Sequence, residues 1–72
     1  MEFRQLGYFI HLAGTGSVSQ SAKVLGLSQP SLSRQIQQLE ENLQVELFER
    51  HHRPMTLTDA GEFLYRHITP IR

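Results

Sequence analysis

The sequence predicts a small, mainly α-helical domain with one two-stranded β hairpin, in the order helix, helix, tight turn, helix, hairpin, helix. Three observations predict it. Apolar residues recur at helical spacing in four segments, capping residues and glycines separate those segments, and strand-like alternation appears only after Leu43. The chain has 72 residues and no cysteine, so we expect one domain that folds by packing alone.

The first two helices are predicted from spacing and capping. The first covers residues 3–13, and its buried face is predicted to hold Phe3, Leu6, Phe9, Ile10 and Ala13. Ser17 and Gln20 form a capping box that starts a second helix, which ends near Leu25. Gly26 then allows a sharp turn, because glycine enters the left-handed conformation without steric cost.

The third helix is predicted to begin after Ser28, its N-cap, and to run over residues 29–43. Pro30 falls in the first turn, where the missing N–H of proline had no partner to lose. One face carries the apolar stripe Leu32, Ile36, Leu39 and Leu43. The opposite face is short, polar and mostly uncharged, and consists of Gln29, Ser33 and Gln37 flanked by Pro30 and Arg34.

The hairpin and a fourth helix follow. VELFER and PMTLT are predicted to pair as strands across the polar tip HHR, over residues of about 46–57, and Pro54 limits the second to an edge strand. Thr58 caps the fourth helix, which Pro70 would end or kink. Its apolar face is predicted to hold Ala60, Phe63, Leu64, His67, Ile68 and Ile71.

The charge distribution is uneven although the formal net charge is zero. A neutral total argues mildly against a nucleic-acid partner, because such proteins usually carry a basic excess. However, six of the seven acidic residues lie at Glu40 or later, and residues 3–39 contain no acid but hold Arg4, Lys23 and Arg34. The segment that contains the third helix is therefore net positive, and six of the seven bases are arginine, which suits phosphate and guanine edges.

Residues 18–37 have the length and pattern of a helix-turn-helix, with small Ala22 where the two helices cross and Gly26 in the turn. An α-helix fits the major groove of B-DNA, and its N-terminal residues reach base edges. Gln29 could pair with adenine, Ser33 with a donor or an acceptor, and Pro30 with a thymine methyl group. Arg34 could take a phosphate or a guanine edge.

At these residues the chain resembles a known family. FRQLGYFIHLAGTGSVSQSAKVLGLSQPSLSRQIQQLE, followed by LFER and LTDAG, is similar to the N-terminal winged helix-turn-helix domain of LysR-type transcriptional regulators, over essentially the whole chain. The resemblance implies a three-helix core with a two-stranded β wing and a C-terminal linker helix. It also implies sequence-specific binding to double-stranded promoter DNA by a dimer or tetramer. Two full-length subunits would pair as a homodimer through the linker helix, with a monomer as the alternative for this 72-residue chain. A small-molecule effector would be bound by a C-terminal domain that the chain lacks.

The resemblance implies roles for individual residues. The DNA-binding domain would be residues 1–58, with 59–72 the start of the linker and dimerisation helix. Base edges would be read by Gln29, Pro30, Ser33 and Arg34; the DNA backbone or minor groove would be contacted by Ser17, Ser28, Gln37, Arg50 and Arg53; and the dimer face would comprise Phe63, Leu64, His67, Ile68 and Ile71.

Two positions depart from the family pattern. Gln44 stands where the family often has glycine after the third helix, so that turn is either strained by about 1 kcal/mol or differently made. Val18 stands where phenylalanine is common, which predicts a looser contact between the first and second helices.

Other interpretations remain open from the sequence. The polar face of the third helix could be an ordinary solvated surface, Arg53 a solvated loop charge, and the fourth helix the docking face of a protein-interaction module. Another winged-helix family, such as the molybdate-responsive relatives, would share the groove chemistry. Neighbouring His51 and His52 would point apart on a strand, so no metal site is expected, and no cofactor or enzymatic motif is predicted. Without a membrane span or a secretory signal, the chain is expected to be cytoplasmic.

Overall fold

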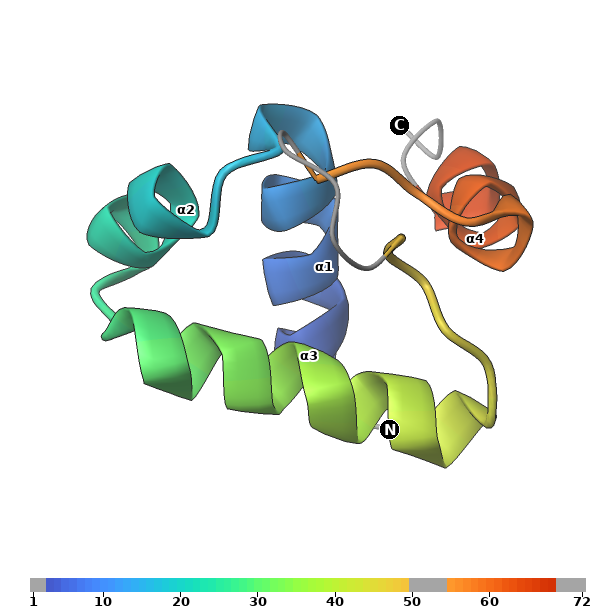
Figure 1. Ribbon diagram of the computed structural model, residues 1–72, viewed down its shortest axis with the longest axis horizontal. Helices are drawn as coiled ribbons and strands as arrows, with labels where there is room; N and C mark the ends of the chain where they lie inside the picture. Colours follow the sequence, from blue (N-terminus) through green and yellow to red (C-terminus); the bar gives the residue numbers. More distant parts are fainter. Residues whose placement is uncertain (1–2, 50–54, 69–72) are drawn as a thin grey trace.

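The computed structural model describes residues 3–49 and 55–68, which form four helices. These are α1 (Phe3–Thr15), α2 (Val18–Leu25), α3 (Gln29–Leu43) and α4 (Asp59–Ile68). The mainly helical fold and the order of the helices are confirmed. In Figure 1, α3 lies along one edge of the molecule, and α1, α2 and α4 all lie to one side of it.

The predicted capping residues start the helices as expected. Ser17 Oγ accepts the Gln20 N–H at 3.2 Å to open α2, and Ser28 Oγ accepts the Ser31 N–H at 3.1 Å to open α3. Thr58 Oγ1 accepts the Gly61 N–H at 3.0 Å at the start of α4. Each hydroxyl satisfies a backbone donor that has no partner within its own helix, which fixes the starting residue.

Left-handed residues end the first three helices. Gly16 has φ 70°, Gly26 has φ 72° and Gln44 has φ 59°. After α2 the Leu27 N–H donates to the Ala22 carbonyl at 2.9 Å, and after α3 the Val45 N–H donates to the Glu40 carbonyl at 3.2 Å. This backward bond is the mark of a Schellman turn, so the turn at Gln44 has ordinary geometry but a residue other than glycine in its strained position.

The core is built where α1, α2 and α3 meet. Its buried apolar residues are Phe9, Leu12, Ala22, Leu32, Ile36, Leu39, Leu47 and Phe48. The rings of Phe9 and Phe48 pack edge to face with centroids 5.6 Å apart. The stripe predicted for α3 is thus confirmed, and it turns the opposite face of that helix outward.

The predicted buried face of α1 is wrong at its first member. Phe3 is 92% exposed, whereas Gln5, Phe9 and Leu12 are buried. Residues 5, 9 and 12 form the inward stripe at helical spacing, and Phe3 lies on a different side of the helix from that stripe. Val18, which departs from the family pattern, is half-buried against the core.

The predicted two-stranded hairpin over 46–57 is not confirmed. In the parts that the structure describes, the two segments make one isolated antiparallel bridge between Phe48 and Leu57 and no strand. The Glu49 N–H donates to the Thr56 carbonyl at 2.8 Å, and the Thr58 N–H donates to the Leu47 carbonyl at 3.0 Å. On the side of α4 the pairing ends because Thr58 already caps that helix. The expected tip at 50–54 lies outside the described residues.

The fourth helix shares the core of the other three. Leu64, Tyr65 and Ile68 pack against the core cluster, and the Tyr65 and Phe9 rings meet edge to face at 6.3 Å. Gly61 lies against the chain before the bridge, where an added Cβ would come within 2.1 Å of the Leu47 carbonyl oxygen. Only a residue without a side chain fits this approach.

Candidate nucleic-acid interface

The second and third helices form a fixed wedge. Ala22 is 2% exposed at the place where they pack, and a larger side chain there would hold α2 away from α3. Gly26 makes the turn between them, and Leu25 and Leu27 are half-buried on either side of it. The residues of the predicted helix-turn-helix therefore lie in one rigid unit.

The predicted base-reading residues lie together on the outer side of α3. Gln29, Pro30, Ser33 and Arg34 are exposed, as is Gln37 one turn further along. They occupy the face opposite the buried residues Leu32, Ile36 and Leu39, as periodicity predicted. With α3 at the edge of the molecule (Figure 1), this face is open to a large partner.

Of the residues predicted to contact the DNA backbone or the minor groove, Ser17 and Ser28 lie in the described parts of the chain, at two helix starts. Ser28 is exposed at the start of α3, and its hydroxyl lies 2.9 Å from the Ser31 hydroxyl. Ser17 is half-buried at the start of α2 and caps that helix. Helix N-termini attract phosphate through free N–H groups and the helix dipole. Arg50 and Arg53 lie outside the described residues.

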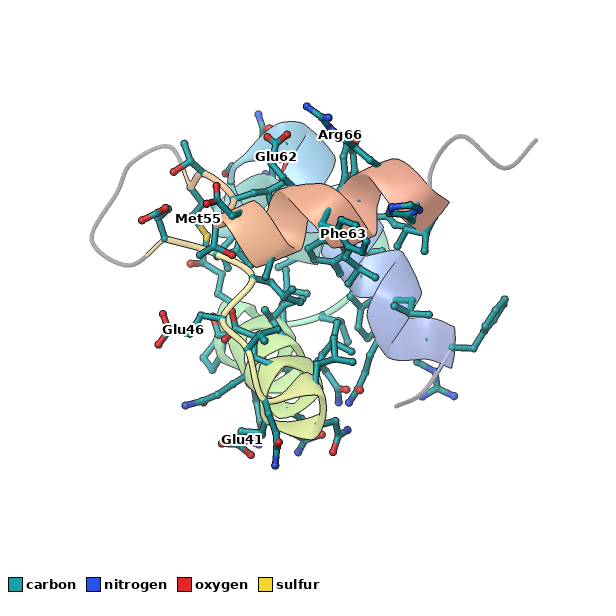
Figure 2. All side chains as sticks on the ribbon, turned by 90° about the vertical axis from the view of Figure 1, so that its right-hand side faces the viewer. Glu41, Glu46, Met55, Glu62, Phe63 and Arg66 are labelled. Carbon is teal, nitrogen blue, oxygen red and sulfur yellow. The ribbon has the colours of Figure 1, made fainter. Side chains whose placement is uncertain are left out.

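Charge changes sign along α3. Arg34 in its first half is exposed, and Lys23 of α2 is exposed as well. The far end carries Glu40 and Glu41, next to an open hollow of about 300 Å³ that Glu46 also lines. Figure 2 shows Glu41 and Glu46 at that end of α3. A polyanion would thus be favoured at the N-terminal half of α3 and repelled at its C-terminal end.

Two partly buried polar networks join α1 to α2 and α3. The Gln5 amide donates to Gln35 Oε1 at 3.0 Å and to Gln38 Oε1 at 3.2 Å, which ties α1 to α3. Ser21 is fully buried, and its hydroxyl lies 2.9 Å from His11 Nδ1 and 2.7 Å from the Thr15 hydroxyl, which ties α1 to α2.

Neither network follows from the apolar pattern of the sequence, because its members are polar side chains on different helices. The helical spacing of residues 5, 9 and 12 was the available signal for Gln5.

The residues predicted for the dimer face of α4 fall into an exposed pair and a half-buried pair. Phe63 is 66% exposed and stacks on the exposed His67 ring, with centroids 4.2 Å apart. Leu64 and Ile68 are half-buried and pack on the chain's own core. Figure 2 shows Phe63 on the outward side of α4, and Ile71 lies outside the described residues.

Among the residues that the structure describes, no helix is both long and apolar enough to span a bilayer. Within the same residues, no group of three or more histidine, cysteine or acidic side chains could hold a metal ion.

The fold and the outer face of α3 define a bacterial regulatory helix-turn-helix protein, and residues 3–62 match the lysR family of that class. The chain belongs to this family.

Named relatives agree with the family assignment. The chain is 56% identical over 61 residues to the HTH-type transcriptional regulator ClcR of Pseudomonas putida, covering 85% of this chain and 21% of ClcR. It is 45% identical over 71 residues to the nitrogen assimilation regulatory protein nac of Escherichia coli K12, covering 99% of this chain and 23% of that protein. The chain therefore spans about a fifth of the length of these relatives. Both are regulators by name, in agreement with the prediction of a chain that is not an enzyme.

Solved structures show the same fold with DNA. The BenM DBD in complex with catB site 1 DNA has a TM-score of 0.90 and 45% identity, over 93% of this chain and 72% of that chain. The CbnR DBD–DNA complex has a TM-score of 0.86 and 49% identity, over 93% of this chain and 77% of that chain.

Proposed function

We propose that this chain binds double-stranded promoter DNA sequence-specifically as the N-terminal domain of a LysR-family transcriptional regulator. The observation that carries the proposal is the outer face of α3, where uncharged polar side chains and one arginine are exposed on a helix whose other face is anchored in the core. Solved relatives of the same fold are complexes with DNA.

Recognition in the major groove would use the first half of α3. Gln29, Pro30, Ser33 and Arg34 would meet base edges, and short side chains such as serine let the helix backbone approach the bases closely. Gln37 would lie near a phosphate, and Ser17 and Ser28 would contact the DNA backbone beside two helix N-termini. The change of charge along α3 supports this assignment, because it directs a duplex toward the N-terminal half.

We propose that the segment 46–57 acts as the wing, with Arg53 in the minor groove and Arg50 at the backbone. The bridge between Phe48 and Leu57 supports the proposal, since it brings the two arms of the segment together. The same proposal includes a two-stranded wing in which the pairing extends beyond this one bridge.

We propose further that residues 1–58 are the DNA-binding unit and that 59–72 begin the helix through which two copies pair. The exposed pair Phe63 and His67 supports this role, whereas Leu64 and Ile68 serve both the core and the start of the interface. The effector would be bound by a part of the regulator outside residues 1–72, and the protein would act in the cytoplasm, where bacterial promoter DNA lies.

Binding to a library of duplexes tests the proposed function. Gln29→Ala and Ser33→Ala are expected to lose about 1 to 3 kcal/mol of binding free energy at particular base pairs. If Arg34 contacts a guanine edge, Arg34→Ala should lose binding at one base pair. If it contacts a phosphate, the variant should weaken binding to all sequences and reduce the salt dependence by about one unit of slope. Asn42→Ala is the matched control, because Asn42 is exposed on α3 but lies away from the proposed contact face. No preference for any duplex at low salt would contradict the proposal.

The pairing helix has its own test. Phe63→Asp changes the exposed side of α4 without emptying the core, so it should reduce self-association in sedimentation experiments while leaving binding to a single half-site unchanged. Loss of a protein partner other than a second copy would instead favour a protein-interaction module.

A further inference from the structure

Glu40 holds the chain that follows α3 with both its main chain and its side chain. Its carbonyl accepts the Val45 N–H at 3.2 Å, within the turn that ends the helix. Its carboxylate oxygen Oε2 accepts the Leu47 N–H at 2.7 Å and the Phe48 N–H at 3.2 Å. Hydrogen bonds to an ionised acceptor are stronger than those between neutral groups, so this is a firm attachment.

The peptide that Glu40 holds also holds the start of α4. The Leu47 carbonyl accepts the Thr58 N–H at 3.0 Å, and the Thr58 hydroxyl donates to the Glu46 carbonyl. Thr58 also caps α4 by accepting the Gly61 N–H, and Gly61 lies directly against the Leu47 carbonyl. Leu47 is therefore hydrogen-bonded to α3 through its N–H and to the start of α4 through its carbonyl.

Burial makes this attachment hard to replace. Leu47 is 1% exposed and Phe48 is 4% exposed. Buried backbone N–H groups need an acceptor. Without the Glu40 carboxylate, the Leu47 and Phe48 N–H groups would lose the acceptor that they bond to, which costs free energy. Glu41, the next residue, has the same charge but is exposed on the outer side of α3 (Figure 2).

The middle of α4 is held differently. The edge-to-face contact of Tyr65 with Phe9 fastens it to α1. Leu64 and Ile68 also pack on the core, so the middle and the end of α4 keep contacts of their own. The attachment at the start is the one that ties the first turn of α4 to α3.

We propose that Glu40 is a positioning residue that sets the direction of α4 relative to the recognition helix α3. The consequence for recognition rests on the proposed function. If two copies pair through α4, the angle that Glu40 maintains determines how far apart the two recognition helices lie, and hence the spacing of half-sites.

Residual dipolar couplings of backbone N–H groups test the proposal on the 72-residue chain without DNA. In the wild type, in Glu40→Gln and in the charge-matched control Glu41→Gln, couplings of all four helices should fit one alignment tensor. In Glu40→Ala, α1, α2 and α3 should still fit one tensor and α4 should depart from it. A fourth helix that keeps its direction in Glu40→Ala, or moves equally in Glu41→Gln, would overturn the proposal.

Hydrogen exchange provides a second measurement that does not require Glu40→Ala to fold. Glu40→Gln keeps an acceptor oxygen but removes its charge, so exchange of the Leu47 and Phe48 amides should rise by about tenfold over Glu41→Gln. Equal exchange in the two variants would overturn the assignment of these bonds to Glu40.

A single half-site duplex separates positioning from DNA contact. Glu40→Ala and Glu41→Gln each remove one negative charge from the same end of α3, and Glu41 lies on the proposed contact side, so neither variant should bind the duplex more weakly than the wild type. A loss in Glu40→Ala as large as that of Arg34→Ala would show that Glu40 contacts DNA and would overturn the positioning role. Failure of the wild-type chain to bind any duplex would refute the proposed function and leave the dipolar-coupling result to decide the role of Glu40.

Discussion

Replacing Gln44 by glycine is expected to stabilise the protein. Gln44 is the one residue other than glycine with a positive φ in the described parts of the chain, and Gly16 and Gly26 occupy the equivalent positions after α1 and α2. A left-handed L-residue costs about 1 to 2 kcal/mol, which glycine avoids. Glycine in turn adds about 0.4 to 1 kcal/mol of entropy to the unfolded chain.

The two terms leave a net gain of about 0.5 to 1 kcal/mol for Gln44→Gly. The side chain of Gln44 is exposed, so little packing is lost with it. Because a domain of this size gains about 4 to 8 °C in Tm per kcal/mol, the variant should melt about 2 to 8 °C higher. Thermal and urea unfolding followed by circular dichroism would measure the change.

Gly26→Ala is the matched control, because it adds the left-handed backbone strain that Gln44→Gly removes. It should therefore lower the free energy of unfolding. Gly26 has φ 72° and nothing lies within 4 Å of an added Cβ, so the folded state gains backbone strain and no clash. Strain less the entropy that alanine removes from the unfolded chain predicts a loss of about 0.5 to 1 kcal/mol. If Gly26→Ala destabilises as expected and Gln44→Gly destabilises too, the strain argument at Gln44 is refuted.

Alanine substitutions at two further glycines should change the free energy of unfolding in opposite directions. Gly7 is exposed within α1 with nothing within 4 Å of an added Cβ, so Gly7→Ala should raise the free energy of unfolding by about 0.5 to 1 kcal/mol. Gly61→Ala should lower it by about 1 to 3 kcal/mol, because the new Cβ would meet the Leu47 carbonyl oxygen at 2.1 Å. Both are measured by urea unfolding; a neutral Gly61→Ala would mean that α4 moves away from the bridge easily.

Local signals predicted the helical part of the fold. The hydroxyls of Ser17 and Ser28 begin α2 and α3 where the sequence placed the caps, and Gly26 makes the predicted left-handed turn. These features depend on residues within one turn of each other, so the sequence nearby determines them.

Features that depend on distant contacts were predicted less well. Burial of Gln5 depends on Gln35 and Gln38 of another helix, and burial of α4 depends on Phe9, so neither follows from local pattern. The same holds for the Glu40 carboxylate, whose partners at Leu47 and Phe48 are brought close only by the turn at Gln44. The extent of the wing does not follow from alternation alone, because the cap at Thr58 ends the pairing on the side of α4.

The sequence predicts where the residues of the candidate site lie, but not which part of DNA each of them contacts. Exposure of Gln29, Pro30, Ser33 and Arg34 follows from the apolar stripe on the opposite face of α3. Which of them meets a base and which a phosphate depends on the position of a duplex, so the assignments remain proposals.

Titration of the isotopically labelled protein with duplex DNA, followed by amide and side-chain NH₂ shifts, tests the central claim most directly. We expect the largest saturable changes at Gln29, Ser33, Arg34 and Gln37, with weaker ones at the start of α2. The exposed side of α4, at Phe63 and His67, should not respond to a single half-site. Changes centred on α4, or none on α3 at low salt, would contradict the account.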